Sequence, residues 1–496
     1  MAKNIVTEHL SIARPEWENS RLVPRIVHLG CGAFHRAHQA LFTHHLLECS
    51  DSDWGICEVN LRPGDGARLI ENLKLQRLLY TVAEQGAADT ELKVIGSVKE
   101  ALHPEFDGIE GILAAMSRPE TAIVSLTVTE KGYCTSAASG KLDLNNPQIQ
   151  HDLAHPQQPK SAVGYIVEAL NTRRRQGKPG FTVLSCDNLS GNGHVAKAAV
   201  LELAVARDPE LAKWIERHVT FPCSMVDRIV PAATPESLER IAEQLGVFDP
   251  CAIACEPFRQ WVIEDNFVNG RPDWDRVGVQ FVDDVFPFEI MKLRMLNGSH
   301  TFLAYLGYLA GYETIADTMS SPAYRTAAKA LMLQEQAVTL SMPQSTDLQG
   351  YAERLISRFA NPALKHRTWQ IAMDGSQKLP PRLLDPIRQH LVAGHCFSHL
   401  ALGVAGWMRY VSGVDEQGHA IEVIDPLVKQ YQVIHQTYSS AQERVHALLR
   451  IDSIFGHDLP KNKRFVSAVM NAYMSLLQQG AHQTVKALEH SGASDD

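Results

Sequence analysis

The fold of the first half of the chain is indicated by one stretch, Arg25-Ile-Val-His-Leu-Gly-Cys-Gly-Ala-Phe-His-Arg-Ala-His38. Residues 26–29 form an apolar run typical of a short buried strand, and helical periodicity follows over residues 37–48. Between them, Gly30 and Gly32 predict a turn whose backbone N–H groups can approach a pyrophosphate. The stretch therefore predicts a dinucleotide-binding turn. The residues that would form it are Ile26, Val27, His28, Leu29, Gly30, Cys31, Gly32, Ala33, Phe34, His35, Arg36 and Ala37.

The match to the dinucleotide-binding pattern G-x-G-x-x-G is incomplete, because its third glycine would fall on His35. A plain strand-to-helix turn therefore stays open as an alternative. Residues 54–60 predict a second strand, near whose end a ribose-binding carboxylate is expected. Glu58 and Asp65 are the candidates, whereas Arg62 could instead meet a 2′-phosphate. We expect NAD as cofactor, with NADP not excluded.

Further strands follow, and polar residues stand where they end. Residues 121–129 and 181–186 are apolar and largely β-branched, as expected for buried parallel strands. Asn188 follows the second of them, at a carboxyl end where a side-chain amide can face a ligand. Asp227 and Arg228 follow another short apolar run. They are candidates for substrate binding or support, and a mutual salt bridge is the alternative.

The region between these strands holds a predicted loop and a predicted helix. Residues 136–160 are rich in Asn, Gln, Pro and His, which predicts a loop or flap. Ser161 is a favourable helix N-cap, and the helix it begins would run to Arg175 and close at Gly177. This helix would be one of the connections between parallel strands.

The second half of the chain is predicted to be helical. From about Phe286 the strand signals stop, and amphipathic periodicity covers residues 286–310, 323–342, 382–411, 421–450 and 463–488. We therefore expect an α/β fold with a Rossmann-like N-terminal domain, residues 1–285, and a mostly α-helical C-terminal domain, residues 286–496. Small ligands usually bind in clefts between domains, so the first helix of the second domain would line the site.

That first helix has the sequence Pro287-Phe-Glu-Ile-Met-Lys-Leu-Arg-Met-Leu-Asn-Gly-Ser-His-Thr-Phe302. On an α-helix, Lys292, Asn297 and His300 fall within an arc of about 140°. Desolvation lowers the pKa of a lysine, so Lys292 could act as a base near neutral pH. The alternative is a lysine that reaches solvent, a helix break at Asn297 and a core histidine whose hydrogen bonds are satisfied.

Composition limits the class of protein. The chain has 496 residues, which is too long for one ordinary core, and its net charge of −9 opposes binding to nucleic acid or anionic membranes. We find no apolar run long enough to span a membrane and no signal-peptide core at the start. The nine cysteines are scattered, with no spacing typical of zinc. We expect a cytoplasmic protein without disulfides or a structural metal.

Several motifs together resemble those of the polyol-specific long-chain dehydrogenases, the mannitol dehydrogenase family. The similarity runs in the family's order over nearly the whole chain, and it is greatest to the mannonate-oxidising branch. The matching stretches are Gly30-Cys-Gly-Ala-Phe-His-Arg-Ala-His38, Thr127-Val-Thr-Glu-Lys-Gly-Tyr133, Ser185-Cys-Asp-Asn188, Met225-Val-Asp-Arg-Ile229, Glu256-Pro-Phe-Arg-Gln-Trp261 and Lys292-Leu-Arg-Met-Leu-Asn-Gly-Ser-His300. Those that indicate the branch are Ile56-Cys-Glu-Val-Asn60 and Trp261-Val-Ile-Glu-Asp-Asn266.

The resemblance implies a role for each matching residue. Lys292 would be the general base, Asn188 and Asn297 would bind the reacting oxygen, and His300 would position the substrate. Supporting roles would fall on Glu289 in proton passage, on Asp227 with Arg228, and on a cation late in the chain that we place at Lys378. A lysine base needs no zinc, and two amides with an ammonium can stabilise a developing alkoxide.

The implied reaction is the reversible reduction of D-fructuronate by NADH to D-mannonate. A sugar acid needs a cation near its far end, and Lys378 or the run Lys365-His-Arg367 could supply it, although that run could also be a solvated surface. The alternatives are mannitol, another polyol or tagaturonate as substrate. A cofactor-binding regulatory protein without catalysis is a further alternative.

Overall fold

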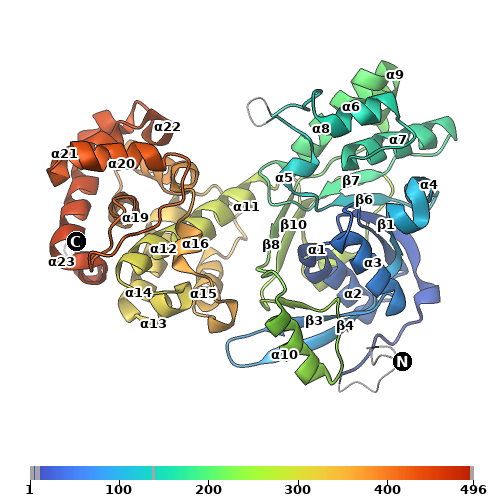
Figure 1. Cartoon of the computed structure of the whole chain (residues 1–496), viewed down its shortest axis with the longest axis horizontal. Coiled ribbons are helices and arrows are strands. Elements are labelled where there is room, and N and C mark those ends of the chain that lie inside the picture. The colour runs from blue at the N-terminus through green and yellow to red at the C-terminus, as the bar shows by residue number, and fades with distance from the viewer. Residues whose placement is uncertain (1–4, 6–11, 137–139, 492–496) are drawn as a thin grey trace. The chain divides into compact units, whose positions relative to one another are not determined.

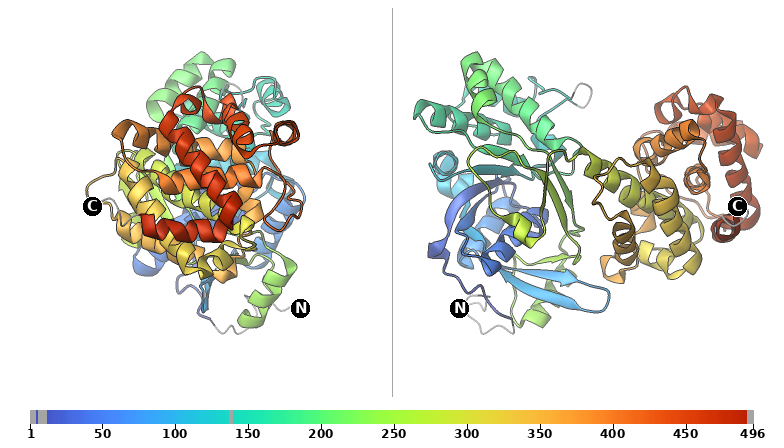
Figure 2. Two further views of the ribbon diagram at one scale, coloured as in Figure 1. Left: turned by 90° about the vertical axis from the view of Figure 1, so that its left-hand side faces the viewer. Right: turned by 180° about the vertical axis from the view of Figure 1, so that it is seen from behind.

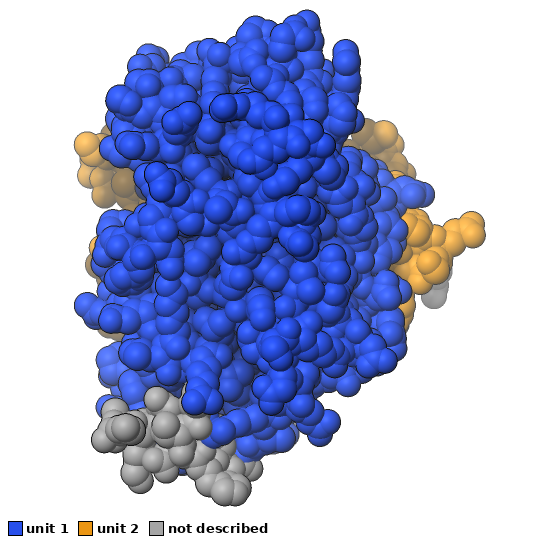
Figure 3. Space-filling view, turned by 90° about the vertical axis from the view of Figure 1, so that its right-hand side faces the viewer, with its two compact units in different colours: residues 1–286 blue, residues 287–496 orange. Residues whose placement is uncertain are grey.

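The structure, a computed structural model, describes residue 5 and residues 12–136 and 140–491. It divides into two compact units, Met1–Phe286 (unit 1) and Pro287–Asp496 (unit 2), shown in Figures 1 and 3. A parallel sheet lies in unit 1, and every regular element described beyond residue 287 is helical. The predicted fold class, a Rossmann-like domain followed by a mostly helical one, is confirmed.

Unit 1 is built on a five-stranded parallel sheet with the order β5-β2-β1-β6-β7. From β1 the chain first adds strands on one side and then continues with β6 on the other. The point between β1 and β6 is therefore the topological switch point, where open parallel sheets bind ligands at the carboxyl ends of their strands. The strands are β1 Val23–Leu29, β2 Trp54–Val59, β5 Val98–Leu102, β6 Ile123–Leu126 and β7 Thr182–Ser185.

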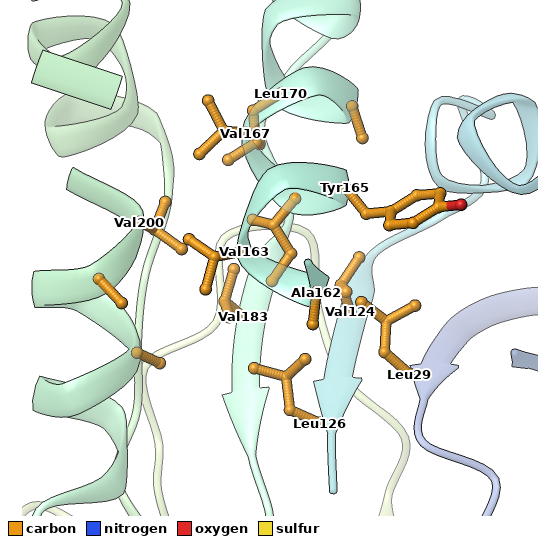
Figure 4. Packing of buried hydrophobic residues seen from close by; sticks show 14 of the residues in the cluster. Leu29, Val124, Leu126, Ala162, Val163, Tyr165, Val167, Leu170, Val183 and Val200 are labelled. Atoms are coloured by element: carbon orange, nitrogen blue, oxygen red, sulfur yellow. The ribbon is translucent and has the colours of Figure 1, made fainter. Parts of the chain in front are cut away.

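This sheet is covered on both faces, which explains why strands such as β6 and β7 are buried along their whole length. On one face, side chains of α7 and α8 such as Val163 and Val200 pack on Leu126 and Val183 (Figure 4). The other core contains residues of α2 together with Trp261. The strand predicted over residues 121–129 is shorter than expected, since its polar end leaves the sheet after Leu126.

Two three-stranded sheets complete unit 1. Their orders are β4-β3-β9 and β11-β10-β8, and each contains one parallel and one antiparallel pair. Asp227 ends β8 and pairs in register with Gln260 of β10. The strands are β3 Tyr80–Gln85, β4 Thr90–Ile95, β8 Ser224–Asp227, β9 Ile253–Cys255, β10 Gln260–Glu264 and β11 Gln280–Val282.

The helices of unit 1 confirm one local prediction and correct two others. Ser161 Oγ accepts the N–H of Gly164 at 2.9 Å, as expected of an N-cap. The first helix begins at Ala33 rather than Ala37, and His38 separates it from the next. The helices are α1 Ala33–Ala37, α2 Gln39–Cys49, α3 Asp65–Leu75, α4 Pro104–Met116, α5 Thr129–Gly132, α6 Pro147–Ala154, α7 Ala162–Arg175, α8 Asn192–Arg207, α9 Pro209–His218 and α10 Pro235–Leu245, with the 3₁₀ turns Asn19–Arg21 and Trp274–Val277.

The loop predicted over residues 136–160 is wrong in part, because α6 (Pro147–Ala154) lies within it. Asn146 Oδ1 accepts the N–H of Gln148 at 2.9 Å, and Pro147 occupies the first helical position. Both features are ordinary start signals of a helix. Residues 137–139 of the predicted loop lie outside the described residues.

Unit 2 consists of helices, seen from two further directions in Figure 2. Two predicted helices are each divided in two: residues 382–411 at Gly394 (φ +76°), and residues 421–450 between Thr437 and Ala441. The sequence analysis missed α15. The helices are α11 Phe286–Met291, α12 Ser299–Leu309, α13 Ile315–Ser320, α14 Pro322–Ala330, α15 Leu348–Phe359, α16 Thr368–Ala372, α17 Gly375–Leu379, α18 Asp385–Ala393, α19 Ser398–Tyr410, α20 Val428–Thr437, α21 Ala441–Leu449, α22 Asp452–Phe455 and α23 Lys463–Ser491, with 3₁₀ turns Ala337–Thr339, Pro362–Leu364 and Leu459–Lys461.

Three π-helical segments interrupt the α-helices of unit 2: η3 Lys292–Gly298, η4 Leu331–Gln336 and η7 Pro380–Leu384. The first contacts both of the others. A Cβ on Gly298 would lie under 3.0 Å from Gln336 Nε2 and 3.0 Å from the carbonyl oxygen of Arg382. The absence of a side chain at Gly298 therefore favours the close packing of the three segments.

Two further facts concern the chain as described. All nine cysteines are free thiols, and those at positions 49 and 396 are exposed. In the described ranges, no helix is both long enough and apolar enough to cross a membrane.

Candidate functional site

The glycine turn lies at the switch point of the parallel sheet. Gly30 has φ +105°, and its N–H donates to the carbonyl oxygen of Val59 at 2.9 Å. Thr127 Oγ1 donates to the Gly30 carbonyl at 2.7 Å. A Cβ on Gly30 would collide with the backbone carbonyl of Thr127. Gly30 is thus required by the close approach of the chain that follows β6.

Gly32, unlike Gly30, has open space beside its Cα. This space bears on whether a dinucleotide fits. A Cβ there would meet only the carbonyl oxygen of Gly30, at 3.7 Å. Gly32 is also the N-cap of α1, and no side chain caps this helix. Open space beside uncapped helical N–H groups fits a phosphate.

Most side chains of the residues predicted for the cofactor turn are buried. The side chains of Ile26, Val27, Leu29, Cys31 and Ala37 are enclosed in the core. Those of His28, His35 and Arg36 are also buried, with hydrogen bonds inside the protein. The part of the turn that remains for a ligand is the backbone from Gly30 to Phe34.

His35, which takes the place of the third glycine, is part of a buried polar cluster. Its Nε2 lies 2.7 Å from Glu58 Oε1, and its ring stacks on His28 with 3.3 Å between ring centroids. Burial lowers the pKa of His35 to about 3 and raises the pKa of Glu58. The contact is therefore a hydrogen bond between a neutral imidazole and a buried carboxyl group.

This cluster bears on the two candidates for ribose binding, because it includes one of them. Glu58 is fully buried and is engaged by His35, so its side chain does not reach a ligand. Asp65, the first residue of α3, is exposed. The sequence could not separate them, because it did not show to which face of the sheet Glu58 points.

Asn188 follows β7 and is exposed, next to a carboxylate that organises the neighbouring loop. Asp187 Oδ2 accepts the hydroxyl of Tyr133 at 2.7 Å, and Oδ1 accepts the N–H of Thr129 at 2.8 Å. Thr129 has φ +62°, which is unusual for a β-branched residue. Asp187 therefore joins the ends of β6 and β7.

Asp227 and Arg228, the two neighbours at the end of β8, are both buried. Asp227 is 4% exposed at the end of β8. The guanidinium of Arg228 donates to the carbonyl oxygens of Ala37 and Glu256 and pairs with the carboxylate of Glu84. Arg228 therefore ties three segments of unit 1 together and its charge is compensated there.

In unit 2 the predicted catalytic helix is continuous but not uniformly α-helical. Lys292 begins the π-helical segment and Asn297 is its penultimate residue. A π-helix bonds residue i to i+5, so Lys292 and Asn297 point in more similar directions than the α-helical arc suggested. Both are half-buried, as are His300 and Glu289, which precedes Lys292 by one turn.

His300 is held between aromatic rings of neighbouring segments. Its ring centroid lies 4.5 Å from that of Phe359 and 5.5 Å from that of His366. Burial, followed by the charges of His366, Arg358 and Arg382, lowers the pKa of His300 well below its ordinary value. A neutral imidazole donates one hydrogen bond and accepts another, which suits the binding of a sugar hydroxyl.

The late cation, Lys378, lies in α17, and its Nζ donates to the carbonyl oxygen of Ile371 at 3.2 Å. Burial lowers its pKa, as does the charge of Arg382, whereas Asp374 and Asp425 raise it. Arg382 was not singled out by the sequence analysis. The only signal for it was an arginine after two prolines, at the start of a segment whose π-helical course was not foreseen.

Of the run Lys365-His-Arg367, only the histidine faces the candidate site. Lys365 and Arg367 are exposed, and Arg367 pairs with Glu313 at 3.2 Å. The ring of His366, by contrast, lies 5.5 Å from that of His300 and is tilted against it. A search of the described residues gives no group of three or more His, Cys, Asp or Glu side chains suited to hold a metal ion.

Comparisons with known proteins cover almost the whole chain. Residues 24–276 match the family model of the mannitol dehydrogenase Rossmann domain, and residues 284–477 match that of the mannitol dehydrogenase C-terminal domain. The chain is 72% identical over 484 residues to D-mannonate oxidoreductase of Escherichia coli (strain K12), covering 98% of this chain and 99% of that protein.

Two solved structures are also similar. One is Pseudomonas fluorescens mannitol 2-dehydrogenase in a ternary complex with NAD and D-mannitol, with a TM-score of 0.76, 40% identity and 96% of each chain covered. The other is a D-sorbitol dehydrogenase in substrate-free form, with a TM-score of 0.88 and 34% identity, covering 95% of this chain and 97% of that one.

Proposed function

Because the chain belongs to the mannitol dehydrogenase family, we propose that this oxidoreductase interconverts D-mannonate and D-fructuronate with NAD(H). The observation that carries the proposal is the 72% identity, over nearly the full length of both chains, to a D-mannonate oxidoreductase. The uncapped glycine turn of unit 1 and the polar face of the helix that carries Lys292 support it.

In the oxidative direction the reaction removes a proton and a hydride from one secondary alcohol. We assign the proton to Lys292 Nζ, which acts as general base on the hydroxyl. The nicotinamide, when bound, supplies the acceptor for the hydride that leaves the same carbon. The C–H and O–H bonds break and a C=O double bond forms, so the reaction needs no further redox partner.

The remaining residues of the proposed set act on the oxygen and on the rest of the substrate. Asn188 and Asn297 would donate amide hydrogens to the oxygen as it becomes an alkoxide and then a carbonyl. His300, whose pKa is lowered well below its ordinary value, would position a neighbouring hydroxyl as a neutral imidazole. Glu289 would pass the proton on from Lys292. Asp227 would support the arrangement from the end of β8.

For the cofactor we propose NAD rather than NADP. Asp65 is exposed at the start of α3, where a carboxylate favours a ribose hydroxyl and repels a 2′-phosphate. Arg62 is exposed nearby in the sequence and is the group that would favour NADP instead. The choice therefore depends on which of these two side chains meets the ribose.

We also propose a small sugar acid as the partner and the cytoplasm as the site of the reaction. A net charge of −9 opposes stable binding to nucleic acid or anionic membranes. The nine free cysteines, seven of them buried, favour a reducing compartment.

A substrate and cofactor screen tests this function. Reduction of D-fructuronate, D-tagaturonate and D-fructose is followed with NADH and with NADPH, and kcat/KM is compared. We expect the largest value for D-fructuronate with NADH. A tenfold preference for D-fructose would make mannitol oxidation the function. A preference for D-tagaturonate would move the assignment to another hexuronate, and a preference for NADPH would reverse the cofactor choice.

A further inference from the structure

Basic side chains gather around His300 in unit 2. The charges of His366, Arg358 and Arg382 all lower the pKa of His300, and the charge of Arg382 also lowers that of Lys378. These residues come from separate segments of unit 2, so the fold itself brings them together. A concentration of positive charge in a partly buried place favours an anion.

Arg382, one of these residues, has protein acceptors for only one of its guanidinium nitrogens among the described residues. Its Nη1 donates to Thr301 Oγ1 at 3.1 Å and to the carbonyl oxygen of Asn297 at 3.5 Å. Within the described ranges, its Nε and Nη2 meet no acceptor, and Arg382 forms no salt bridge. Burial lowers its pKa to about 10, and no carboxylate opposes that shift. Arg382 is only half-buried, so a ligand can still reach these two nitrogens.

Other buried arginines show what a compensated guanidinium looks like in this protein. Arg228 pairs with the carboxylate of Glu84. Arg173 has no acid partner, but its nitrogens donate to four backbone carbonyls. A guanidinium whose donors are not taken by the protein can offer two parallel N–H groups to a planar anion. The contrast indicates that Arg382, unlike Arg228 and Arg173, has donors available for a ligand.

The other cations of unit 2 fit this role less well. Lys378 already donates to a carbonyl oxygen, and Asp374 and Asp425 oppose its charge. Arg367 is exposed and pairs with Glu313. Arg382, by contrast, contacts the backbone of Asn297, a residue of the proposed catalytic set on the same helix as Lys292.

We propose that Arg382 binds the carboxylate of the sugar-acid substrate and thereby makes the enzyme prefer a sugar acid to an uncharged polyol. The proposal rests on the proposed function, which supplies the carboxylate. Two parallel N–H···O bonds from Nε and Nη2 would match its two oxygens. Proton and hydride transfer would remain with the groups already assigned.

The test compares Arg382→Gln with the wild type on D-fructuronate and D-fructose, both with NADH. The quantity of interest is the ratio of the two kcat/KM values. Loss of charged hydrogen bonds to a carboxylate should lower this ratio by roughly 10- to 100-fold, mainly through the KM for D-fructuronate. The matched control is Arg367→Gln, which removes an exposed arginine paired with Glu313 and should leave the ratio unchanged.

Each outcome either supports the proposed role of Arg382 or overturns it. If both substrates lose activity in the same proportion, Arg382 only holds the helix in place and the proposal is overturned. If Arg382→Gln is unfolded by circular dichroism, Arg382→Lys replaces it. We then expect a ratio below that of the wild type, because the charge remains but the fork is lost, and an unchanged ratio would overturn the proposal. A wild type that prefers D-fructose contradicts the proposed function itself, whatever the variants do.

Discussion

Units 1 and 2 present functional groups in different ways. In unit 1 the candidate cofactor turn is backbone: Gly30 is fixed by the approach of Thr127, and Gly32 opens onto free space. In unit 2 the candidate groups are side chains, carried by a helix whose π-helical segment sets their directions. A backbone site depends on glycine and sheet topology, whereas a side-chain site depends on local helix geometry.

The difference explains why the two units were not equally predictable. A strand followed by glycines is recognisable from residue types alone, because only glycine tolerates φ +105° beside a backbone carbonyl. A π-helical segment has no such signature. It arises here where Gly298 lets η3 pack on two other π-helical segments, which is a tertiary effect.

The largest effect is expected for Gly30→Ala, compared with Gly32→Ala. A Cβ at position 30 collides with the Thr127 carbonyl at a positive φ, so we expect a loss of about 3 kcal/mol or more in the free energy of unfolding, measured with urea. At position 32 a Cβ meets only one atom, at 3.7 Å, so stability should change by less than about 1 kcal/mol.

Gly32→Ala should nevertheless weaken NADH binding, because its methyl group would enter the space assigned to the pyrophosphate. Titration of the folded variant with NADH measures this directly. If NADH binds both glycine variants as it binds the wild type, the cofactor does not approach this turn. Unit 1 would then not bind the cofactor through its backbone turn.

The next effect concerns Gly298→Ala in unit 2. Its Cβ would collide with Gln336 Nε2 and press on the Arg382 carbonyl, so the Gln336 side chain must shift and the backbone at Arg382 must give by a few tenths of an ångström. We expect a loss of about 1–3 kcal/mol in stability. We also expect kcat to fall more than KM rises, since Asn297 would move.

The control for this variant is Gly111→Ala in α4, where the nearest atom to a new Cβ is Asp107 Cβ at 3.5 Å. That change should be neutral or slightly stabilising. If Gly298→Ala retains wild-type kcat with a lower melting temperature, the π-helical segment matters for stability alone.

Acid should destabilise unit 1 more than unit 2, because more buried histidines lie in it. The histidines whose pKa is lowered with burial as the main cause are His28, His35, His38, His44 and His45 in unit 1 and His300, His366 and His435 in unit 2, among the described residues. Below pH about 6.5 these histidines bind protons in the unfolded chain but stay neutral in the folded protein. The free energy of unfolding should then fall as the pH falls, by up to about 1.4 kcal/mol per pH unit for each fully buried histidine.

Carboxyl groups whose pKa is raised in the folded protein change the stability in the opposite direction. Burial raises the pKa of Glu58 and Asp187, so in acid the folded protein takes up their protons first, which offsets part of the loss. The measurement is urea unfolding at pH 7.5 and pH 5.5, with NADH binding as the readout of unit 1. Equal stability at the two pH values would show that the histidines are accessible to protons in the folded state.

The smallest effect is expected for Asp65→Ser. Removing an exposed carboxylate near the expected ribose should raise kcat/KM with NADPH and lower it with NADH, changing their ratio by about tenfold. Arg62→Ser is the matched control, and it should not improve NADPH use. An unchanged ratio in Asp65→Ser would mean that another group meets the ribose.

Particular residues show what the sequence could and could not provide. Ser161 was correctly expected to cap α7, because its capping bond depends on neighbours a few residues away. Glu58 was a candidate for ribose binding, yet it lies against His35, since the face to which a strand residue points depends on register. Arg382 was missed because its surroundings come from distant segments of the chain.

The central claim is that Lys292 supplies the base while unit 1 supplies the nucleotide turn. Its most direct test is Lys292→Ala, assayed for D-mannonate oxidation with NAD and for NADH binding by titration. We predict a loss of several orders of magnitude in kcat with NADH affinity kept within about threefold. Near-normal turnover by this variant would contradict the account.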